Sequence, residues 1–307
     1  MFEITILGSS AAIPVGKRRP TAQVVTYHNR HYLVDCGEGT QMQLGRYRVK
    51  LARLDAIFIS HMHGDHVLGL PGLLNTLSLL GRNFPLKLYG PAALKPMLDN
   101  IFETTQGHLA YKIEFTATDD FAPGEAIMDT GRLQVQVLPL EHRIYCRGYR
   151  FQEVNVRPKF NFPKAKSLEI PNVYFGSLKR GLSVTLEDGR VIDPDTVLSP
   201  PDNPVSYAYC SDTRYSEALI PYIKNATLLY HESTFDKSMG KRAIETFHST
   251  AEQAASIAKQ AEVNHLLIGH FSARYRSLEP LLEEAQEVFP DTSLAVEGDL
   301  FKVKDYV

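Results

Sequence analysis

The chain of 307 residues contains no tryptophan and only three cysteines, Cys36, Cys146 and Cys210. An odd number of widely spaced cysteines gives no disulfide framework and is typical of proteins from reducing compartments. No apolar run approaches the roughly 20 residues that span a bilayer, and the first residues lack the basic segment and apolar core of a secretory signal. We therefore expect a cytoplasmic protein that does not associate with a membrane.

Excess charge of one sign is also missing, since the formal net charge is only −2. The chain as a whole gives no sign of a polyanionic partner, so any surface that binds nucleic acid must be local. What the chain does have is 44% hydrophobic residues, enough to bury a substantial core. Its length suits one large α/β domain or two small ones.

The most distinctive segment holds three histidines and an aspartate within residues 61–66. The apolar run 56–59 before it predicts a buried strand, and the residues after it predict a helix up to about residue 80. A polar loop whose histidines only form hydrogen bonds is the simpler alternative. So many ligand types in one turn favour a metal site instead.

Within this segment, His61 and His63 are two residues apart, so on extended backbone their side chains can converge on one ion. Gly64 can adopt the positive φ that bends the chain. Asp65 and His66 then point toward a second position. Imidazole nitrogens together with carboxylate oxygens suit zinc, with manganese or iron possible.

Further candidate ligands each follow a predicted strand, as residues 61–66 do. In open α/β sheets ligands gather at the carboxyl ends of strands, so we expect these residues to meet in space. The candidates are His142 after 135–140, Asp212 after 205–210, His231 after 228–230 and His270 after 266–268.

Together these residues can hold two metal ions. Two ions about 3.5–4 Å apart can deprotonate a bridging water and stabilise charge on a phosphoryl or carbonyl oxygen, so the predicted chemistry is hydrolysis. His231 and His248 are left without a metal role. The predicted ligands are His61, His63 and His142 for one ion, Asp65, His66 and His270 for the other, and Asp212 as the bridge.

Two other features allow more than one interpretation. Asp35, at the end of a predicted strand, either hydrogen-bonds to the metal loop or caps the following helix. The basic cluster 17–19 is on its own best interpreted as a solvated loop.

Strands alternate with helices in the first and last thirds of the chain, and more strands occupy the middle. This order predicts an α/β sandwich and not a helical bundle. The expected elements include strands at 2–7, 22–27, 86–89 and 113–116, and helices at 91–104, 250–261 and 278–288.

Residues 152–203 break this pattern with many prolines and few long apolar runs. Within 157–180, six basic residues face a single acidic residue, and four aromatic residues are interleaved with them. Such an insertion is either disordered or a protruding functional element. Its composition suits contact with phosphates and bases, and a solvated surface excursion is the alternative.

Several motifs distributed over nearly the whole chain can be compared with known families. They lie at 7–9, 35–41, 61–73, 89–91, 211–214, 231–234, 247–250 and 269–275. In this order they resemble the metallo-β-lactamase superfamily and, within it, the ribonuclease Z family of tRNA 3′-processing endonucleases. The metal loop alone would identify only the superfamily. The Asp-Cys-Gly-Glu-Gly-Thr, His-Ser-Thr and Ser-Ala-Arg-Tyr segments are more specific.

The resemblance implies a single domain, residues 1–307, with the αββα sandwich of the metallo-β-lactamase fold. It also implies two zinc ions per subunit and a homodimer in which the arm of one subunit clamps tRNA bound at the other. Residues 152–203 are similar in position to this inserted, protruding arm, and 174–181 look like its tip or return strand.

The activity implied by the resemblance is removal of the 3′ trailer from precursor tRNA, which leaves a 3′-hydroxyl on the tRNA and a 5′-phosphate on the trailer. Asp65 would accept a proton from the attacking water while it ligates metal. His248 would stabilise or protonate the leaving 3′ oxygen, oriented by a carboxylate such as Glu232. The residues expected to bind tRNA are Lys17, Arg18, Lys179 and Arg180.

Two other functions remain alternatives. The first is hydrolysis of small esters, lactones or thioesters by the same fold, which has no need of a basic insertion. The second is a nucleic-acid-binding protein with a structural or redox site. Structural zinc sites favour cysteine-rich shells, however, and no cysteine lies among the predicted ligands.

Overall fold

The computed structural model describes residues 1–307 and divides into two compact units. We call Met1–Gln152 together with Val205–Val307 the core unit, and Glu153–Pro204 the insertion unit. None of the helices in either unit has the length and apolar character that crossing a bilayer requires.

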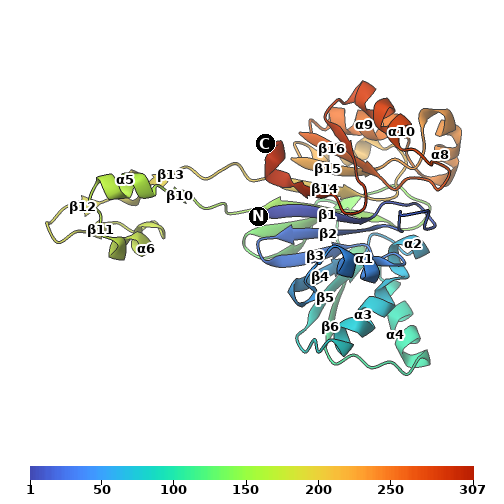
Figure 1. The fold of residues 1–307 in the computed structure, drawn as a ribbon, viewed down its shortest axis with the longest axis horizontal. Coiled ribbons are helices and arrows are strands. Elements are labelled where there is room, and N and C mark those ends of the chain that lie inside the picture. Colours follow the sequence, from blue (N-terminus) through green and yellow to red (C-terminus); the bar gives the residue numbers. More distant parts are fainter. The chain divides into compact units, whose positions relative to one another are not determined.

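The core unit is built on two seven-stranded sheets (Figure 1). The first has the order β18-β1-β2-β3-β4-β5-β6 and the second the order β17-β16-β15-β14-β9-β8-β7. The strands of the first sheet are β1 (Phe2–Gly8), β2 (Ala22–Tyr27), β3 (Arg30–Val34), β4 (Leu54–Phe58), β5 (Leu86–Gly90), β6 (Ile113–Ala117) and β18 (Leu300–Lys302). Those of the second are β7 (Ala126–Asp129), β8 (Leu133–Pro139), β9 (Arg147–Glu153), β14 (Ser206–Cys210), β15 (Leu228–Glu232), β16 (His265–Gly269) and β17 (Thr292–Leu294).

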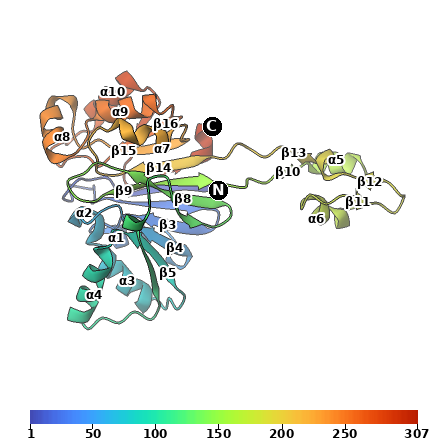
Figure 2. The ribbon, with the colours of Figure 1, turned by 180° about the vertical axis from the view of Figure 1, so that it is seen from behind.

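Helices cover the outer face of each sheet (Figures 1 and 2). They are α1 (Thr40–Arg46), α2 (Gly64–Val67), α3 (Leu70–Leu79), α4 (Leu94–Thr104), α7 (Ile220–Ile223), α8 (Gly240–Thr246), α9 (Ala251–Gln260) and α10 (Glu279–Val288). Leucines of α1, α3 and α4 share one apolar cluster with the first sheet, and α9 and α10 share another with the second. Two packed sheets flanked by helices confirm the predicted αββα sandwich.

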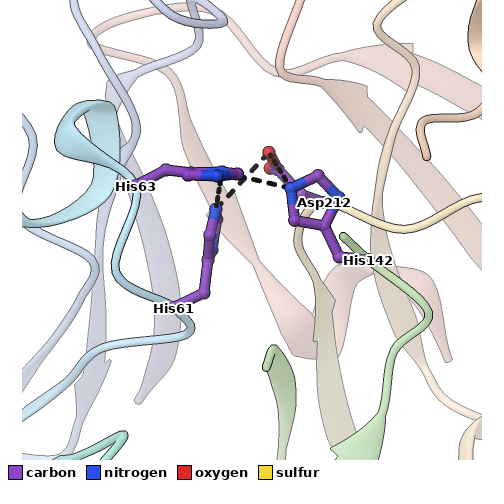
Figure 3. A group of neighbouring side chains, drawn as sticks. All are labelled: His61, His63, His142 and Asp212. Atoms are coloured by element: carbon purple, nitrogen blue, oxygen red, sulfur yellow. Dashed lines mark hydrogen bonds and ion pairs between the residues drawn. The ribbon is translucent and has the colours of Figure 1, made fainter. Parts of the chain in front are cut away.

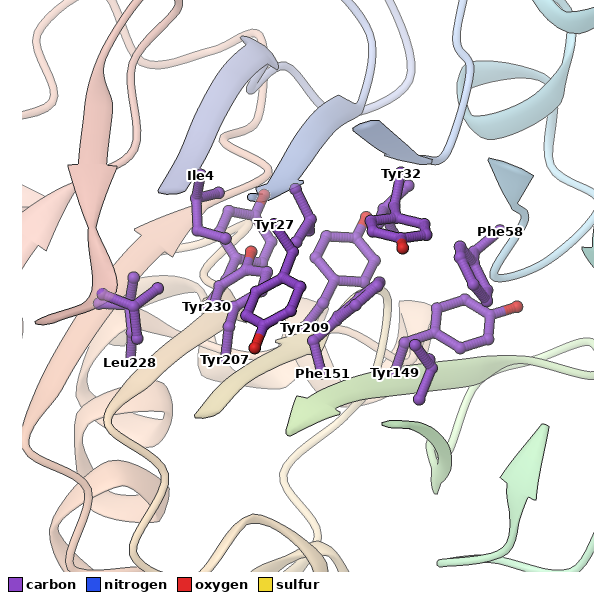
Figure 4. Packing of buried hydrophobic residues seen from close by; sticks show 14 of the residues in the cluster. Ile4, Tyr27, Tyr32, Phe58, Tyr149, Phe151, Tyr207, Tyr209, Leu228 and Tyr230 are labelled. Atoms are coloured by element: carbon purple, nitrogen blue, oxygen red, sulfur yellow. The ribbon is translucent and has the colours of Figure 1, made fainter. Parts of the chain in front are cut away.

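Side chains from the inner faces of the two sheets form an aromatic core between them (Figure 4). The rings of Phe58 and Tyr149, one from each sheet, have centroids 5.2 Å apart. The hydroxyl of Tyr149 donates to the carbonyl of Ile59 at 2.6 Å, and that of Tyr209 donates to Asp35 at 2.7 Å. These bonds tie the chain just beyond β3 and β4 to the second sheet. The core therefore supports the edge at which the predicted ligands lie.

The start of α9 shows how local sequence fixes the chain beside a site residue. The side chain of Thr250 accepts a bond from the amide of Gln253, whose side chain accepts one from the amide of Thr250. This capping box satisfies amides that the helix leaves free. It also anchors the backbone two residues after His248.

The strand predicted at 22–27 is confirmed by β2, and the helix predicted after the metal loop, up to about residue 80, is confirmed by α3. The helical turn α2 within the loop itself was not predicted. Two helices, α2 and α3, occupy this region. The amide of Gly69 leaves the helical ladder between them and donates to the carbonyl of Cys36 at 2.9 Å. A Cβ at Gly69 would lie 2.1 Å from the carbonyl oxygen of Gly37, so only glycine allows this approach. Asp65 and His66 lie on the helical turn α2, and Gly64, its first residue, does not have the positive φ expected for it.

The insertion unit has a small apolar core of its own, which contains Ile170, Leu178 and Ile192. Its elements are β10 (Lys159–Phe160), α5 (Phe162–Ser167), α6 (Phe175–Leu178), β11 (Val184–Thr185), β12 (Val191–Ile192) and β13 (Leu198–Ser199). The return strand that the resemblance suggested at 174–181 is wrong, because the structure has helical turns there. On a helix, Tyr174 and Leu178 share one face, and both pack into this small core.

Candidate functional site

The candidate site forms where chain segments leave the ends of strands. In the first sheet, β4 leads to His61. In the second, β8 leads to His142, β14 to Asp212 and β16 to His270. Because β14, β15 and β16 are parallel, their carboxyl ends lie at the same edge of the sheet.

Four of the predicted residues form one group (Figure 3). Nδ1 of His63 lies 3.1 Å from Nε2 of His61 and 3.1 Å from Nε2 of His142. Oδ2 of Asp212 lies 3.6 Å from Nε2 of His61 and 3.8 Å from Nε2 of His142. The four side chains point toward a common centre, as the ligands of one ion would.

A second group lies on the other side of Asp212. Its Oδ1 is 3.2 Å from Nε2 of His66 and 3.2 Å from Nε2 of His270. Oδ2 of Asp65 lies 3.6 Å and 3.5 Å from the same two nitrogens. Asp212 therefore turns one carboxylate oxygen toward each group, as a bridging ligand would.

The hydrogen bonds of the second group indicate which ring nitrogen carries the proton. Nδ1 of His66 lies 2.8 Å from a carboxylate oxygen of Asp35, which accepts, so Nδ1 donates. Nδ1 of His270 lies 2.9 Å from Oγ1 of Thr234, whose own proton goes to Glu232. This nitrogen therefore donates as well. Nε2 of each ring is therefore the nitrogen that faces the group, and it offers a lone pair when the ring is neutral.

Two histidines of the first group follow the same rule, whereas His63 turns Nδ1 toward the group. Nδ1 of His142 donates to the carbonyl of Phe247 at 3.0 Å. Nδ1 of His61 donates to Oγ of Ser60 at 2.9 Å, because the hydroxyl proton of Ser60 goes to Asp35. Nε2 of each ring is again left with a lone pair that faces the group.

With both rings neutral, as metal ligands are, these contacts bring acceptors together without a donor between them. The lone pairs of His66 and His270 face each other across 3.3 Å, with a carboxylate oxygen of Asp212 beside both. All three side chains are buried, and a buried cluster of acceptors is unfavourable unless a cation lies among them. Imidazole and carboxylate donors suit zinc, manganese or iron. The residues present therefore fit a divalent metal centre.

The charges of the groups agree with this assignment. Burial favours the neutral form of Asp212, but His270, His66 and His61 outweigh it and hold the pKa of Asp212 well below its usual range. Burial also holds the pKa of His61 well below its usual value, which keeps that ring neutral. Burial opposes charge on His66 as well, but Asp212, Asp65 and Asp35 outweigh it and raise the pKa of His66 well above its usual value. A metal ion at this group would take the place of the proton on Nε2 of His66.

His248 and Glu232 form a pair beside the metal groups. Nδ1 of His248 lies 2.7 Å from Oε1 of the fully buried Glu232, which also accepts bonds from Thr213 and Thr234. Burial opposes the charge on His248, but the Glu232 carboxylate outweighs it and raises the pKa of His248 to about 9. The pair therefore presents a protonated imidazole. The expectation that His231 meets the other candidate residues is wrong, because β15 (Leu228–Glu232) continues past it and Nδ1 of His231 donates to the carbonyl of Glu232.

A cavity of about 660 Å³ opens onto both groups and onto His248. Asp65, whose side chain is 11% exposed, lines it together with His142 and His270. Three exposed arginines from separate segments also line it: Arg143, Arg242 and Arg274. The cavity thus places cationic side chains around the two predicted metal-ligand groups.

Curated relatives cover almost the entire chain. Ribonuclease Z of Parabacteroides distasonis is 42% identical over 297 residues, which cover 97% of this chain and 97% of the relative. Ribonuclease Z of Bacteroides thetaiotaomicron is 41% identical over 311 residues, covering 99% and 96%. The chain belongs to the ribonuclease Z family.

Solved structures show the fold of this ribonuclease Z family member. Human tRNase Z, short form, has a TM-score of 0.69 and 24% identity, covering 98% of this chain and 99% of its own. YhfI of Bacillus subtilis, a metallo-β-lactamase fold protein, also has a TM-score of 0.69, with 21% identity and 98% of both chains covered. A family model described as Anti-Pycsar protein Apyc1 matches residues 2–144. The metallo-β-lactamase fold predicted from the sequence motifs is confirmed.

The residues expected to bind tRNA divide between the two units of this ribonuclease Z family member. In the core unit, Lys17 is exposed, whereas Arg18 is half-buried and its Nη2 donates to the carbonyl of Tyr275 at 2.7 Å. In the insertion unit, Lys179 and Arg180 are both exposed. Arg18 thus has a structural contact that the sequence did not reveal.

The structure also separates the two roles left open for Asp35. Its carboxylate bonds to Ser60 and His66, whereas α1 begins after Gly39 without a side-chain cap. Sequence analysis missed Ser60 and Thr234, which orient two of the histidines. Ser60 directly precedes the metal loop, and Thr234 lies in the segment 231–234, whose sequence resembles the ribonuclease Z family. The signal in the sequence is a hydroxyl residue beside a ligand segment, because a metal-binding histidine needs a hydrogen-bond partner for its second ring nitrogen.

Proposed function

We propose that this ribonuclease Z family member is a metal-dependent endoribonuclease that removes the 3′ trailer from precursor tRNA. The products are a 3′-hydroxyl on the tRNA and a 5′-phosphate on the trailer. The observation that carries the proposal is the pair of ligand groups that share Asp212 below a cavity lined with arginines. The substrate class comes from the relatives named ribonuclease Z, which are about 40% identical over nearly the full chain.

The proposed cofactor is a pair of zinc ions, with manganese or iron as the alternatives. When bound, two such ions supply an activated water and stabilise negative charge on the phosphoryl group. The residues that would hold them are His61, His63 and His142 for one, Asp65, His66 and His270 for the other, and Asp212 for both.

The protein's own groups handle the protons of the reaction. Asp65 is ionised and lines the cavity, so it can accept a proton from the attacking water. His248 also lines the cavity, and because Nδ1 is held by Glu232, Nε2 is the nitrogen available to the substrate. We assign Nε2 the role of donating a proton to the leaving 3′ oxygen of the tRNA.

Electrostatics supports an RNA substrate over a small ester. Arg143, Arg242 and Arg274 can contact phosphates on either side of the scissile bond. Lys17 is exposed on the segment 11–20, whose two ends line the cavity. In the insertion unit, the ammonium of Lys179 lies 4.5 Å from the ring centroid of Phe162, which is 53% exposed. A cation beside an exposed ring suits a phosphate next to an unstacked base.

Two further properties complete the proposal. A homodimer is suggested by the family resemblance, and the exposed apolar side chains of Met42, Leu79 and Leu80 offer surface for such a contact. A cytoplasmic location is consistent with three cysteines that are buried and unpaired.

Cleavage of a precursor tRNA with a 3′ trailer tests the function directly. We expect one cut near the discriminator nucleotide, with a 3′-hydroxyl on the tRNA and a 5′-phosphate on the trailer when both new ends are mapped. Pre-treatment with a chelator should abolish the cut, and added zinc should restore it. A protein that holds about two zinc ions yet leaves the precursor intact would point to the small-ester hydrolase instead.

Removal of the insertion unit should separate RNA binding from the chemistry. β9 and β14 are antiparallel, with Gln152 opposite Ser206, so a short Asn-Gly turn can replace residues 153–204. We expect kcat/KM for precursor tRNA to fall at least ~10-fold, with a shallower salt dependence, because phosphate contacts are lost. Turnover of bis(p-nitrophenyl) phosphate should be retained.

Single substitutions refine this experiment. The slope of the logarithm of the tRNA binding constant against the logarithm of salt concentration should become shallower by about one in Lys179→Ala. This is the value for the loss of one phosphate contact. Lys259→Ala, an exposed lysine at the end of α9 in the core unit, is the matched control and should leave the slope unchanged. Unaltered tRNA binding after removal of 153–204 would show that the insertion has another role.

A further inference from the structure

A short segment after β1 contacts the carboxylate to which we assign proton acceptance. We call residues 9–13 the strap. The backbone amide of Ala12 donates to Oδ2 of Asp65 at 2.7 Å. This is the same oxygen that lies nearest to His66 and His270 in the second ligand group. The strap therefore holds one orientation of the Asp65 carboxylate.

The strap also contacts the segment that follows β16. The amide of Ala11 donates to the carbonyl of Phe271 at 3.0 Å, and the amide of Phe271 donates to the carbonyl of Ser9 at 2.8 Å. Phe271 directly follows His270. The strap is thus bonded on one side to Asp65, which follows the first sheet, and on the other to the second sheet.

The backbone at Ala12 is in an uncommon conformation. Its φ is 62°, in the left-handed region that residues other than glycine rarely adopt. A bond from the amide of Ile13 to the carbonyl of Ala11 closes a tight turn, and Oγ of Ser10 donates to the carbonyl of Ile13. Such a conformation persists only where its surroundings hold it, and it is what aims the Ala12 amide at Asp65.

The side chain of Glu297 holds the two ends of the loop that contains the strap. Oε1 of Glu297 accepts from the amide and the hydroxyl of Ser9 at 2.9 and 3.1 Å, and from the amide of Arg19 at 2.9 Å. Ser9 and Arg19 are the two ends of the loop that carries the strap. Gly8, just before it, passes so close to the carbonyl of Pro20 that no Cβ would fit.

We propose that Glu297 is a positioning residue that acts on the reaction through the strap. By holding both ends of the loop, it fixes the Ala12 amide, and that amide fixes Asp65 at the metal centre. Glu297 does not line the cavity and need not touch the substrate. The hydrogen bonds from Glu297 to Asp65 do not depend on the proposed function. Only the proton-accepting role of Asp65 rests on it.

Zinc affinity provides a test that does not depend on RNA. Zinc affinity can be measured by competition with a chromophoric chelator. We expect Glu297→Ala to bind one of its two zinc ions ~10–100-fold more weakly than the wild type. This is the range of loss observed when a residue that hydrogen-bonds to a metal ligand is removed. At saturating zinc, kcat for bis(p-nitrophenyl) phosphate should fall by a similar factor while KM changes little. Glu297→Gln keeps an oxygen acceptor and should restore most of both.

Two further variants keep the result interpretable. Ser9→Ala removes one of the three bonds and should give a smaller loss in the same direction, even if Glu297→Ala folds poorly. Glu283→Ala, an exposed glutamate on α10, is the control and should match the wild type. Wild-type zinc affinity and kcat in both Glu297→Ala and Ser9→Ala would overturn the proposal. Failure of the wild type to cut tRNA would overturn only the proposed function.

Discussion

Replacing Asp212 by alanine is expected to abolish trailer removal, with kcat/KM for precursor tRNA reduced at least ~1000-fold. Asp212 is the one side chain that faces both ligand groups, with Oδ1 toward His66 and His270 and Oδ2 toward His61 and His142. Without Asp212, each ligand group loses one carboxylate oxygen that would bind its metal ion. Metal analysis should therefore find fewer than two ions, alongside the loss of cleavage.

The fold should survive this substitution, because Asp212 lies beyond the end of β14 and outside the three large apolar clusters of the core unit. Far-ultraviolet circular dichroism should match that of the wild type. Asp99→Ala is the matched control, since Asp99 is exposed and pairs only with Lys95 on α4. Full activity and two bound ions in the Asp212 variant would contradict the two-group metal centre.

Position beyond a predicted strand end identified most of the side chains that meet, but it also selected His231, which lies within β15 and apart from the ligand groups. The rule that ligands lie beyond strand ends selected His142, Asp212 and His270, although they are far apart in the sequence. For Asp212 and His270 this worked because β14, β15 and β16 are parallel, so their carboxyl ends lie at the same edge of the sheet. The alternation of strands and helices predicted an α/β sandwich, and the αββα arrangement came from the family resemblance.

What the sequence did not predict depends on backbone groups in irregular segments. The amide of Ala12 and the carbonyl of Phe247 each hold a site side chain, and both residues have positive φ. No side-chain periodicity marks such positions, because any residue offers the same amide and carbonyl. The break between α2 and α3 is of the same kind, since it depends on the contact of Gly69 with the chain after β3. Tertiary contact decided each of these.

Replacing His248 by alanine should have the second largest effect, and one that depends on the leaving group. The tRNA 3′ oxygen leaves as a basic alkoxide unless it receives a proton, so we expect cleavage of precursor tRNA to slow ~10²–10⁴-fold. p-Nitrophenolate leaves without protonation. Turnover of bis(p-nitrophenyl) phosphate by the same variant should therefore stay near the wild-type rate. Zinc content should be unchanged, because Nδ1 of His248 is held by Glu232.

Glu232→Gln tests the same assignment through pH. The carboxylate of Glu232 opposes the effect of burial and raises the pKa of His248 to about 9, so His248 is protonated at neutral pH. Without that charge its pKa falls, and less of the acid form remains as the pH rises. The alkaline limb of the rate profile for tRNA cleavage should thus move to lower pH in this variant. Equal losses on RNA and on the nitrophenyl ester in His248→Ala would show that His248 acts on the metal centre or the fold, and not on the leaving group.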